Sequence, residues 1–253
     1  MLGIIGGMGP QAGMSLYGQI LAHTPAQKDQ AHIPTILWST PHRIPDRSAY
    51  LLGESTENPA YPVADIALQL EQLGVRIVGI PCNTFHAAPI WTAFAERLTK
   101  EGSRLQVLHL VQETVAAIQR NNQGGPIGVL GTLGTYQSGT YARALQEAGI
   151  EALEPAPREK ARLHDAIYNP YYGIKALHYI GPVASDIIRN VAESMHSETL
   201  LLGCTELCIE TPDRPGSFPG PYETINPLAI LAQAMVNQYG KTGIAGVQRE
   251  EMV

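Results

Sequence analysis

The sequence is short of cysteine, of basic residues and of long apolar runs. Its three cysteines are an odd number in a chain of 253 residues, which does not suggest a disulfide framework. Lys and Arg number 17 against 23 Asp and Glu, and they form no basic stripe of the kind that binds nucleic acid. No apolar run approaches the roughly 18 to 20 residues that cross a bilayer. We therefore expect neither nucleic acid nor a membrane among its partners.

The N-terminal residues and the thiols indicate where the protein is expected to work. Apolar residues begin at Leu2 with no basic segment before them, so residues 1–7 do not resemble a signal peptide. With 44% hydrophobic and only 16% charged residues, the chain is expected to form a packed core. A cytoplasmic protein with reduced thiols is the simplest expectation.

Short β-branched runs alternate along the chain with longer segments of helical periodicity. This alternation predicts βαβ units and mostly parallel sheets, and the nearly continuous apolar runs are typical of strands covered on both faces. The predicted strands span residues 3–7, 34–39, 76–80, 105–109, 127–131 and 199–203. The predicted helices include residues 11–23, 60–73, 85–99, 136–148 and 181–195. The expected fold class is therefore α/β.

Two features recur in the second half of the chain at nearly the same offset. An apolar run leading into a G-x-x-G loop occurs at residues 3–9 and again at residues 128–134, which are 125 positions apart. An apolar run ending in cysteine occurs at Cys82 and again at Cys204, which are 122 positions apart. A repeat of this length predicts two pseudo-symmetric lobes descended from one unit.

The repeat also predicts where the lobes divide and where a ligand binds. The first lobe is expected to contain residues 1–114 and 222–253, and the second lobe residues 115–221. Ligands of open α/β sheets bind outside the carboxyl ends of the strands, and both cysteines follow a predicted strand. Cys82 and Cys204 are therefore expected to face each other across a cleft between the lobes. The polar residues from 240 onward are expected to be disordered or peripheral.

Two facing cysteines suit proton transfer at a stereocentre. Inversion needs one group that removes a proton from one face of a carbon and another that delivers a proton to the opposite face. Thiol and thiolate are close in free energy near neutral pH once the pKa is tuned. Asn83 and Thr84 after the first cysteine, and Thr205 after the second, are typical of helix N-termini, where free backbone N–H groups bind anions. The two turns are thus expected to lower the thiol pKa and to hold a carboxylate.

Five short segments carry a resemblance to a known family. They read GGMGP at residues 6–10, IPDRS at 44–48, PCNTFH at 81–86, GT at 131–132 with SG at 138–139, and LGCTEL at 202–207. In this order, they resemble the aspartate/glutamate racemase superfamily, most closely its aspartate racemase branch, over roughly residues 2–238. The resemblance implies a two-lobe α/β fold with the active site between the lobes. It also implies a homodimeric isomerase that racemises a small acidic amino acid, aspartate first, with no cofactor, neither pyridoxal phosphate nor a metal.

The same resemblance assigns roles to residues at the two cysteine turns. Cys82 and Cys204 would be the catalytic acid/base pair that moves the α-proton. Asn83, Thr84 and Thr205 would hold the α-carboxylate of the substrate through their side chains and backbone amides. The resemblance thus places substrate binding at the same turns as catalysis.

Three further residues are expected at the substrate. Arg47 resembles the family arginine that pairs with the side-chain carboxylate of aspartate, and Lys175 resembles a lysine that assists at the same end. Met8 lies in the glycine loop, which lacks the G-x-G-x-x-G spacing of a nucleotide fingerprint. That loop is instead expected to approach the substrate closely, because glycine permits the backbone geometry that a close approach needs.

The residues alone leave other kinds of site open. Cys82 and His86 are four positions apart, as are Cys204 and Cys208, so a zinc site can be imagined, although structural zinc sites usually have tighter pairs in loops. We therefore expect no metal. His86 could also serve a cysteine nucleophile of a hydrolase, tune the thiol, or only pack. Cys208 has no counterpart in the first half and is expected in the core.

Other activities are compatible with the same residues. A glutamate or broad-specificity amino-acid racemase is one alternative. An isomerase or decarboxylase of related acids, which would use cysteine at one or both positions, is another. A protein that only binds an acidic amino acid would keep Arg47 but would not need two thiols. A redox sensor would form a reversible disulfide between the two cysteines. Interconversion of L- and D-aspartate by two-base proton transfer is the first expectation.

Overall fold

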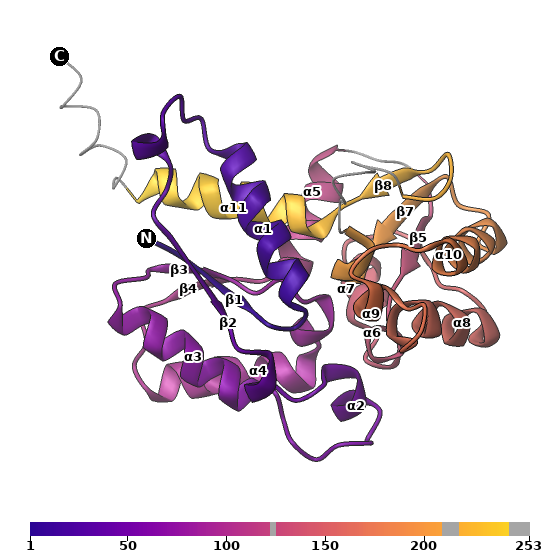
Figure 1. The fold of residues 1–253 in the computed structure, drawn as a ribbon, viewed down its shortest axis with the longest axis horizontal. Coiled ribbons are helices and arrows are strands. Elements are labelled where there is room, and N and C mark those ends of the chain that lie inside the picture. The colour runs from indigo at the N-terminus through magenta and orange to yellow at the C-terminus, as the bar shows by residue number, and fades with distance from the viewer. Residues whose placement is uncertain (122–124, 209–217, 243–253) are drawn as a thin grey trace.

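Two four-stranded sheets organise the chain, one in each of two lobes (Figure 1). The computed structural model describes residues 1–121, 125–208 and 218–242. Every strand pairing found in the two sheets is parallel. The predicted α/β class, with two lobes and parallel sheets, is confirmed. Most of the polar tail, residues 243–253, lies outside the described residues.

All six predicted strands are present, and two short strands were not predicted. The first sheet has the order β2-β1-β3-β4 and the second β6-β5-β7-β8. The strands are β1 (Leu2–Gly6), β2 (Thr35–Ser39), β3 (Ile77–Gly79), β4 (Gln106–Leu108), β5 (Ile127–Leu130), β6 (Ala152–Leu153), β7 (Thr199–Leu202) and β8 (Glu223–Ile225). With two and three residues, β6 and β8 are too short to show a periodicity. Because β8 pairs with β7, the second sheet continues past residue 221, where the second lobe was expected to end.

The two sheets are built alike, which accounts for the repeat in the sequence. β1 lies between β2 and β3, and β5 lies between β6 and β7. Leu2 of β1 pairs with both Thr35 and Ile77, and Ile127 of β5 has the same central position in its own sheet. β1 thus corresponds to β5, and β3 to β7. The two cysteines follow equivalent strands, β3 and β7, at the carboxyl edges of their sheets.

The predicted helices are present, with two differences in their bounds. The α-helices are α1 (Pro10–His23), α2 (Arg47–Leu51), α3 (Ala60–Gln72), α4 (Ala88–Lys100), α5 (Leu110–Asn121), α6 (Leu133–Gln137), α7 (Thr140–Glu147), α8 (Pro157–Tyr168), α9 (Ile174–Leu177), α10 (Pro182–Ser194) and α11 (Pro227–Lys241). Residues 136–148, predicted as one helix, are split between α6 and α7, because Gly139 adopts a φ of 60° in the left-handed region. Residues 85 and 86 belong to a 3₁₀ turn, η3 (Asn83–His86), ahead of α4.

Helices cover both faces of the first sheet, which explains its apolar strands. α1 and α11 lie on one face, and α3 and α4 lie on the other (Figure 1). Leu2 and Ile4 of β1 pack into one core, and Ile5 packs into a second core on the opposite face. The first core also contains residues of α5, α11 and the second sheet, so one continuous core joins the lobes. None of the described helices is both long and apolar enough to cross a membrane.

The lobes also touch directly where α2 meets α6. A Cβ atom added to Gly134 of α6 would lie 2.8 Å from Cα of Ser48 in α2, a contact that only movement of the backbone could relieve. Gly134→Ala is therefore expected to lower the free energy of unfolding by about 1–3 kcal/mol, as measured by urea denaturation. Gly18→Ala in α1 is the matched control, because the Cβ added there meets nothing within 4 Å. The control should be neutral or stabilising by up to about 1 kcal/mol, and equal losses would contradict the contact.

Candidate active site

A small cavity lies between the lobes, where β1, β3 and β7 end. Its lining consists of Met8, Arg47, Cys82, Asn83, Thr84, Thr132, Tyr168, Lys175, Cys204, Thr205 and Glu206. All eight residues predicted to act in catalysis or substrate binding are among them, so the structure brings every one of these side chains together. No role at the site was predicted for Thr132, Tyr168 or Glu206.

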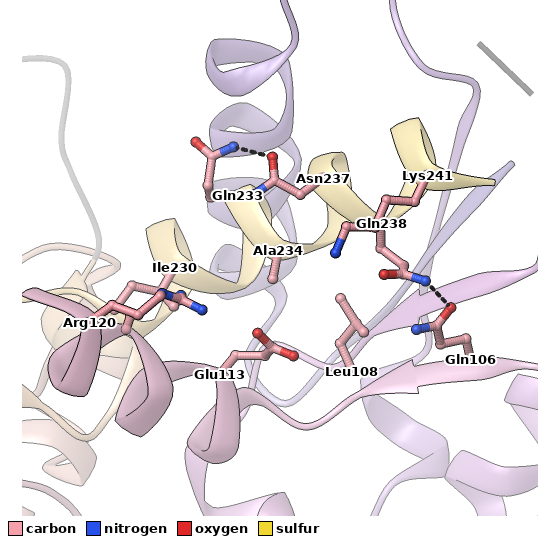
Figure 2. A pocket seen from close by; sticks show the side chains of 11 residues that line it. Gln106, Leu108, Glu113, Arg120, Ile230, Gln233, Ala234, Asn237, Gln238 and Lys241 are labelled. Carbon is pink, nitrogen blue, oxygen red and sulfur yellow. Dashed lines mark hydrogen bonds between the residues drawn. The ribbon is translucent and has the colours of Figure 1, made fainter. Parts of the chain in front are cut away.

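A larger, open groove lies elsewhere, between β4, α5 and α11 (Figure 2). Its volume is about 490 Å³, and the described residues that line it include no cysteine and none of the predicted site residues. Across the groove, Gln238 donates a hydrogen bond to Gln106 at 2.8 Å, and along α11 Gln233 donates to Asn237 at 3.0 Å (Figure 2). These polar side chains are paired with one another at the surface. The small cavity is therefore the candidate active site.

Each cysteine of the cavity follows a strand and precedes a single turn of 3₁₀ helix. Cys82 is 4% exposed and is followed by η3 (Asn83–His86), whereas Cys204 is 5% exposed and is followed by η4 (Thr205–Cys208). The residues typical of helix N-termini thus form short 3₁₀ turns. Both thiols are free. Two buried free thiols on the lining of one cavity can act on the same small molecule.

The thiol of Cys204 is held by the carboxylate of Glu206. Cys204 Sγ donates a hydrogen bond to Glu206 Oε2 at 3.0 Å, and Thr205 Oγ1 donates to the same oxygen at 3.2 Å. Burial raises the pKa of Cys204 well above its ordinary value, and the negative charge of Glu206 raises that pKa further. The expectation that the turn lowers the thiol pKa is wrong for Cys204, which keeps its proton.

Glu206 is also one half of an ion pair in the cavity. Its Oε1 lies 2.6 Å from Lys175 Nζ, and the Glu206 side chain is only 6% exposed. Burial by itself would raise the pKa of Glu206, but the charge and hydrogen bond of Lys175 outweigh it and lower that pKa. Lys175, which was expected beside a carboxylate of the substrate, thus holds a carboxylate of the protein. Gly9 leaves room for this pair, because a Cβ atom there would lie 2.8 Å from Glu206 Oε1.

Arg47 supplies the other cation of the cavity and lies near Cys82. It opens α2, and its guanidinium donates to the backbone carbonyls of Met8 at 3.1 Å and Pro45 at 3.2 Å. Burial by itself would lower the pKa of Arg47, but nearby groups that can carry negative charge, Cys82 first, raise it above its ordinary value. Arg47 Nε is buried without a hydrogen-bond partner among the described residues. The two thiols thus have opposite surroundings, a cation near Cys82 and an anion at Cys204.

Asn83 and Thr84 are held by residues of the second lobe. Asn83 Oδ1 accepts a hydrogen bond from Tyr141 Oη at 2.5 Å, while Asn83 Nδ2 is a buried donor without a partner among the described residues. Thr84 Oγ1 instead shares hydrogen bonds with the hydroxyl oxygens of Thr132 at 3.2 Å and Thr135 at 3.1 Å. The amide of Asn83 is thus available to a ligand, whereas the hydroxyl of Thr84 is engaged between the lobes.

Comparison with known proteins shows the family to which the chain belongs. The family model described as Asp/Glu/Hydantoin racemase matches residues 5–235 of the chain. The chain belongs to this racemase family. Its membership makes the protein an isomerase of the racemase type, as the resemblance in the sequence predicted. The matched residues include both lobes and both cysteines of the cavity.

Relatives in the racemase family are similar over nearly the whole chain at low identity. The broad specificity amino-acid racemase RacX of Bacillus subtilis is 24% identical over 245 residues, which are 94% of this chain and 98% of that protein. The aspartate racemase of Picrophilus torridus has a TM-score of 0.77 at 24% identity over 94% of each chain. The glutamate racemase of Aquifex pyrophilus has a TM-score of 0.60 at 21% identity over 94% of this chain and 83% of that one. The fold is common to this chain and the two solved structures, whereas the substrates named for the three proteins differ.

Glu206 is the cavity residue that the sequence analysis most clearly missed. It stands in the LGCTEL segment of the racemase resemblance, two positions after Cys204, and that short spacing was the available signal. Thr132 stands in the GT segment of the same resemblance, whereas Tyr168 is distant from both cysteines in the sequence and gave no such signal. Tyr168 Oη donates to Asp46 Oδ2 at 3.2 Å, a contact that joins the second lobe to the first.

His86 packs behind Cys82 in this racemase-family protein. Its Nδ1 bonds the backbone carbonyl of Cys82 at 2.8 Å, its ring stacks on Trp91 with centroids 5.0 Å apart, and it meets His109 at 4.7 Å. Burial lowers the pKa of His86 to about 3, so the ring is neutral and Nδ1 donates the proton to the carbonyl. These contacts support the packing interpretation rather than that of a hydrolase base.

The neutral His86 predicts how stability depends on pH. Its pKa is about 3 in the folded protein against an ordinary 6.5, so between these values the unfolded chain binds the proton and the folded protein does not. The contribution to the free energy of unfolding is fully present above pH 6.5 and is lost as the pH falls towards 3, by up to about 1.4 kcal/mol per pH unit. Burial lowers the pKa of His109 to about 4, which adds in the same direction.

Urea denaturation between about pH 4.5 and 7 measures this slope. His86→Asn keeps a donor for the Cys82 carbonyl but cannot titrate. The slope of unfolding free energy against pH should therefore fall by about the contribution of one bound proton. An unchanged slope in His86→Asn would show that the buried ring is not neutral.

Cys208 lies in the core, as expected. Its thiol donates weak hydrogen bonds to the backbone carbonyls of Leu202 at 3.7 Å and Cys204 at 3.8 Å. Among residues 1–121, 125–208 and 218–242, no three His, Cys, Asp or Glu side chains are grouped so as to hold a metal ion. The zinc interpretation of the cysteine spacings therefore gains no support from the structure.

Proposed function

We propose that the protein interconverts L- and D-aspartate by moving the α-proton between Cys82 and Cys204. The observation that carries this proposal is the cavity between pseudo-symmetric lobes, to which each lobe contributes one free, buried thiol. Inversion of a carbon centre needs a proton donor and a proton acceptor on opposite faces. Two thiols that come from opposite lobes are suited to that requirement.

The charges around the cavity favour an acidic amino acid as the substrate. Arg47 and Lys175 bring two cations, of which Glu206 balances one. Asn83 Nδ2 and Arg47 Nε are buried donors without a partner among the described residues. A ligand with two carboxylates would satisfy both, with Asn83 at the α-carboxylate and the planar guanidinium of Arg47 at the side-chain carboxylate. Aspartate is shorter than glutamate by one methylene group and suits a small cavity better.

The proposed proton transfer uses only groups of the chain, with neither pyridoxal phosphate nor a metal. The thiolate of one cysteine takes the α-proton, the electron pair of the C–H bond stays on the α-carbon, and the thiol of the other cysteine delivers a proton to the opposite face. Hydrogen bonds from Asn83 Nδ2, and from the backbone of the turns at Thr84 and Thr205, would stabilise the charge that develops on the α-carboxylate.

The closed cavity requires that the lobes move to admit the substrate. Its volume of about 10 Å³ is no more than a single water molecule needs, far below that of an amino acid. Contacts between the lobes, such as that of Tyr168 with Asp46, would break on opening and form again on closing. Closure would exclude water from the reacting carbon and strengthen the electrostatic interactions around it.

The resemblance also predicts a homodimer, the N-terminal residues and the thiols predict a cytoplasmic location, and both remain predictions. Light scattering on the purified protein at several concentrations measures the first. A mass of twice 27.3 kDa would support the dimer, whereas a mass of 27.3 kDa at every concentration would contradict it. The activity proposed here does not depend on the result, because each chain contains both cysteines of the cavity.

Deuterium exchange at the α-carbon tests the proposed function. The purified protein, with reductant and no added cofactor, is incubated in deuterated water with each enantiomer of aspartate, glutamate and alanine. NMR reports the exchange, and chiral chromatography reports the optical purity. We expect exchange with loss of optical purity for aspartate. Faster turnover of glutamate would assign a glutamate racemase, equal turnover of alanine would assign a broad-specificity racemase, and no exchange with any of them would overturn the proposal.

A further inference from the structure

One carboxylate in the cavity connects a cation to a catalytic thiol. Glu206 Oε1 accepts a hydrogen bond from Lys175 Nζ at 2.6 Å, and Glu206 Oε2 accepts one from Cys204 Sγ at 3.0 Å. Thr205 Oγ1 also donates to Oε2 at 3.2 Å. A change in the ion pair with Lys175 therefore alters the carboxylate that is hydrogen-bonded to Cys204.

In the free protein this arrangement keeps Cys204 protonated. A carboxylate whose charge is balanced by an ammonium group is a weak base, and Lys175 lowers the pKa of Glu206 despite the burial of that carboxyl. Burial and the negative charge of Glu206 both raise the pKa of the Cys204 thiol, and the positive charge of Lys175 offsets only part of that rise. The thiol thus cannot pass its proton to Glu206 while Lys175 remains bound there, and Cys204 cannot act as a base.

A second carboxylate held by Arg47 would lie on the same small cavity lining as this ion pair. The cavity volume is about 10 Å³, and a Cβ atom at Gly9 would already lie 2.8 Å from Glu206 Oε1 and 3.8 Å from Lys175 Nζ. Lys175 is the more exposed partner, since its side chain is 25% exposed whereas that of Glu206 is 6% exposed. An incoming carboxylate can therefore draw the ammonium group away while Glu206 stays in place.

We propose that the second carboxylate of the substrate takes Lys175 from Glu206, and that the released Glu206 then accepts the thiol proton of Cys204. This inference rests on the proposed function and adds a catalytic role for Glu206 to it. It ties the activation of Cys204 to a substrate with two carboxylates. A monocarboxylic amino acid leaves the ion pair intact and Cys204 protonated.

The proton transfers balance when both thiols begin protonated. The S–H proton of Cys204 moves to Glu206 Oε2 and leaves a thiolate, which takes the α-proton and leaves the C–H electron pair on the α-carbon. Cys82 gives its S–H proton to the opposite face, and its sulfur keeps the electron pair near the guanidinium of Arg47. Glu206 finishes protonated and Cys82 finishes as a thiolate, and Glu206 returns its proton to Cys204 when the reaction runs in reverse. When the product leaves instead, exchange with water removes the proton from Glu206 and returns one to Cys82, which resets the protein for the next turnover. No oxidant, reductant or further reactant is required.

A one-base reaction separates the two cysteines experimentally. Loss of chloride from 3-chloroaspartate needs only the base that faces the α-proton, since the C–H electron pair expels chloride from the neighbouring carbon. In Cys82→Ala the remaining base is Cys204, and in Cys204→Ala it is Cys82. The probe has two stereocentres, so one diastereomer is used, and chloride release from each of its two enantiomers identifies which one each variant processes.

Glu206→Gln is then added to both single-cysteine variants. The amide has the size of the carboxyl group but cannot take the thiol proton. We expect chloride release by the Cys82→Ala protein to fall at least about 100-fold more than release by the Cys204→Ala protein. Equal losses in the two proteins would mean that the amide disturbs the whole cavity. Either equal losses or no loss in either protein would overturn the role of Glu206.

Lys175→Met tests the exchange of partners separately. In the Cys82→Ala protein, this change frees Glu206 without a second carboxylate, so kcat for chloride release from 3-chloroalanine should rise about tenfold. An unchanged or lower kcat would overturn the exchange. If the parent protein turns over neither aspartate nor glutamate, the proposed function fails and this inference with it. If the parent racemises aspartate but the two variants behave otherwise than expected, only the inference fails.

Discussion

Cys82→Ala and Cys204→Ala should each lower the rate of aspartate racemisation by at least about 10³-fold. Each substitution removes the proton donor or acceptor on one face of the α-carbon, and no other described thiol lines the cavity to replace it. The cavity holds little water that could serve instead, because its volume is about 10 Å³. Chiral chromatography of the reaction from both enantiomers measures the loss.

Cys208→Ala is the matched control for these variants. Cys208 is buried like the other two cysteines, but its thiol donates to backbone carbonyls in the core rather than into the cavity. We expect its racemisation rate to stay within about threefold of the parent while its stability falls by roughly 1 kcal/mol. Racemisation by Cys204→Ala within tenfold of the parent would show that a two-cysteine mechanism does not operate. A similar loss in all three variants would point to damaged folding instead.

Arg47→Met should weaken the binding of dicarboxylates by about 10²- to 10³-fold, because it removes the planar cation proposed to hold the side-chain carboxylate. The guanidinium is buried, its Nε has no partner among the described residues, and its two other nitrogens are oriented by the carbonyls of Met8 and Pro45. A carboxylate that enters the cavity would complete its hydrogen bonds. We therefore expect kcat/KM for aspartate to fall in the same proportion.

The specificity of this effect separates binding from folding. Succinate and butyrate have the same carbon chain and differ by one carboxylate, so calorimetry with both measures what Arg47 contributes to the second carboxylate. The affinity of Arg47→Met for succinate should fall by about 10²- to 10³-fold, and its affinity for butyrate by less than about threefold. Arg47→Lys keeps the charge but loses the planar guanidinium. We expect its affinity for succinate to lie between those of the parent and of Arg47→Met. Equal losses for the two ligands would assign Arg47 a structural role.

The fold could be predicted where a local pattern was long enough to read. Six strands were apparent because each contains a short, nearly continuous apolar run, whereas β6 and β8, with two and three residues, show no pattern. The division between α6 and α7 was missed because it depends on the left-handed backbone of Gly139, and glycine is also common where the backbone is right-handed. The lobe boundary near residue 221 was placed before β8, whose pairing with β7 is a contact between distant segments.

The candidate site could be predicted as a set of residues but not as a set of contacts. Lys175 was expected at the substrate, yet it pairs with Glu206, which lies 31 positions further along the chain. Thr84 was expected to hold a carboxylate, yet its hydroxyl meets Thr132, 48 positions away in the other lobe. The pKa of Cys204 was expected to be low, yet its carboxylate neighbour and its burial raise it.

By itself the sequence determined the α/β class, the internal repeat, the racemase family and eight of the eleven residues that line the cavity. These follow from local apolar patterns, from short motifs, and from the fact that parallel strands end at one edge of a sheet. Only the tertiary structure decided which charges pair, which thiol has an anion beside it, and which buried donors are left for a ligand. Those outcomes depend on separations of about 3 Å between side chains, and such separations are set by how the turns and helices pack within each lobe and where the two lobes meet.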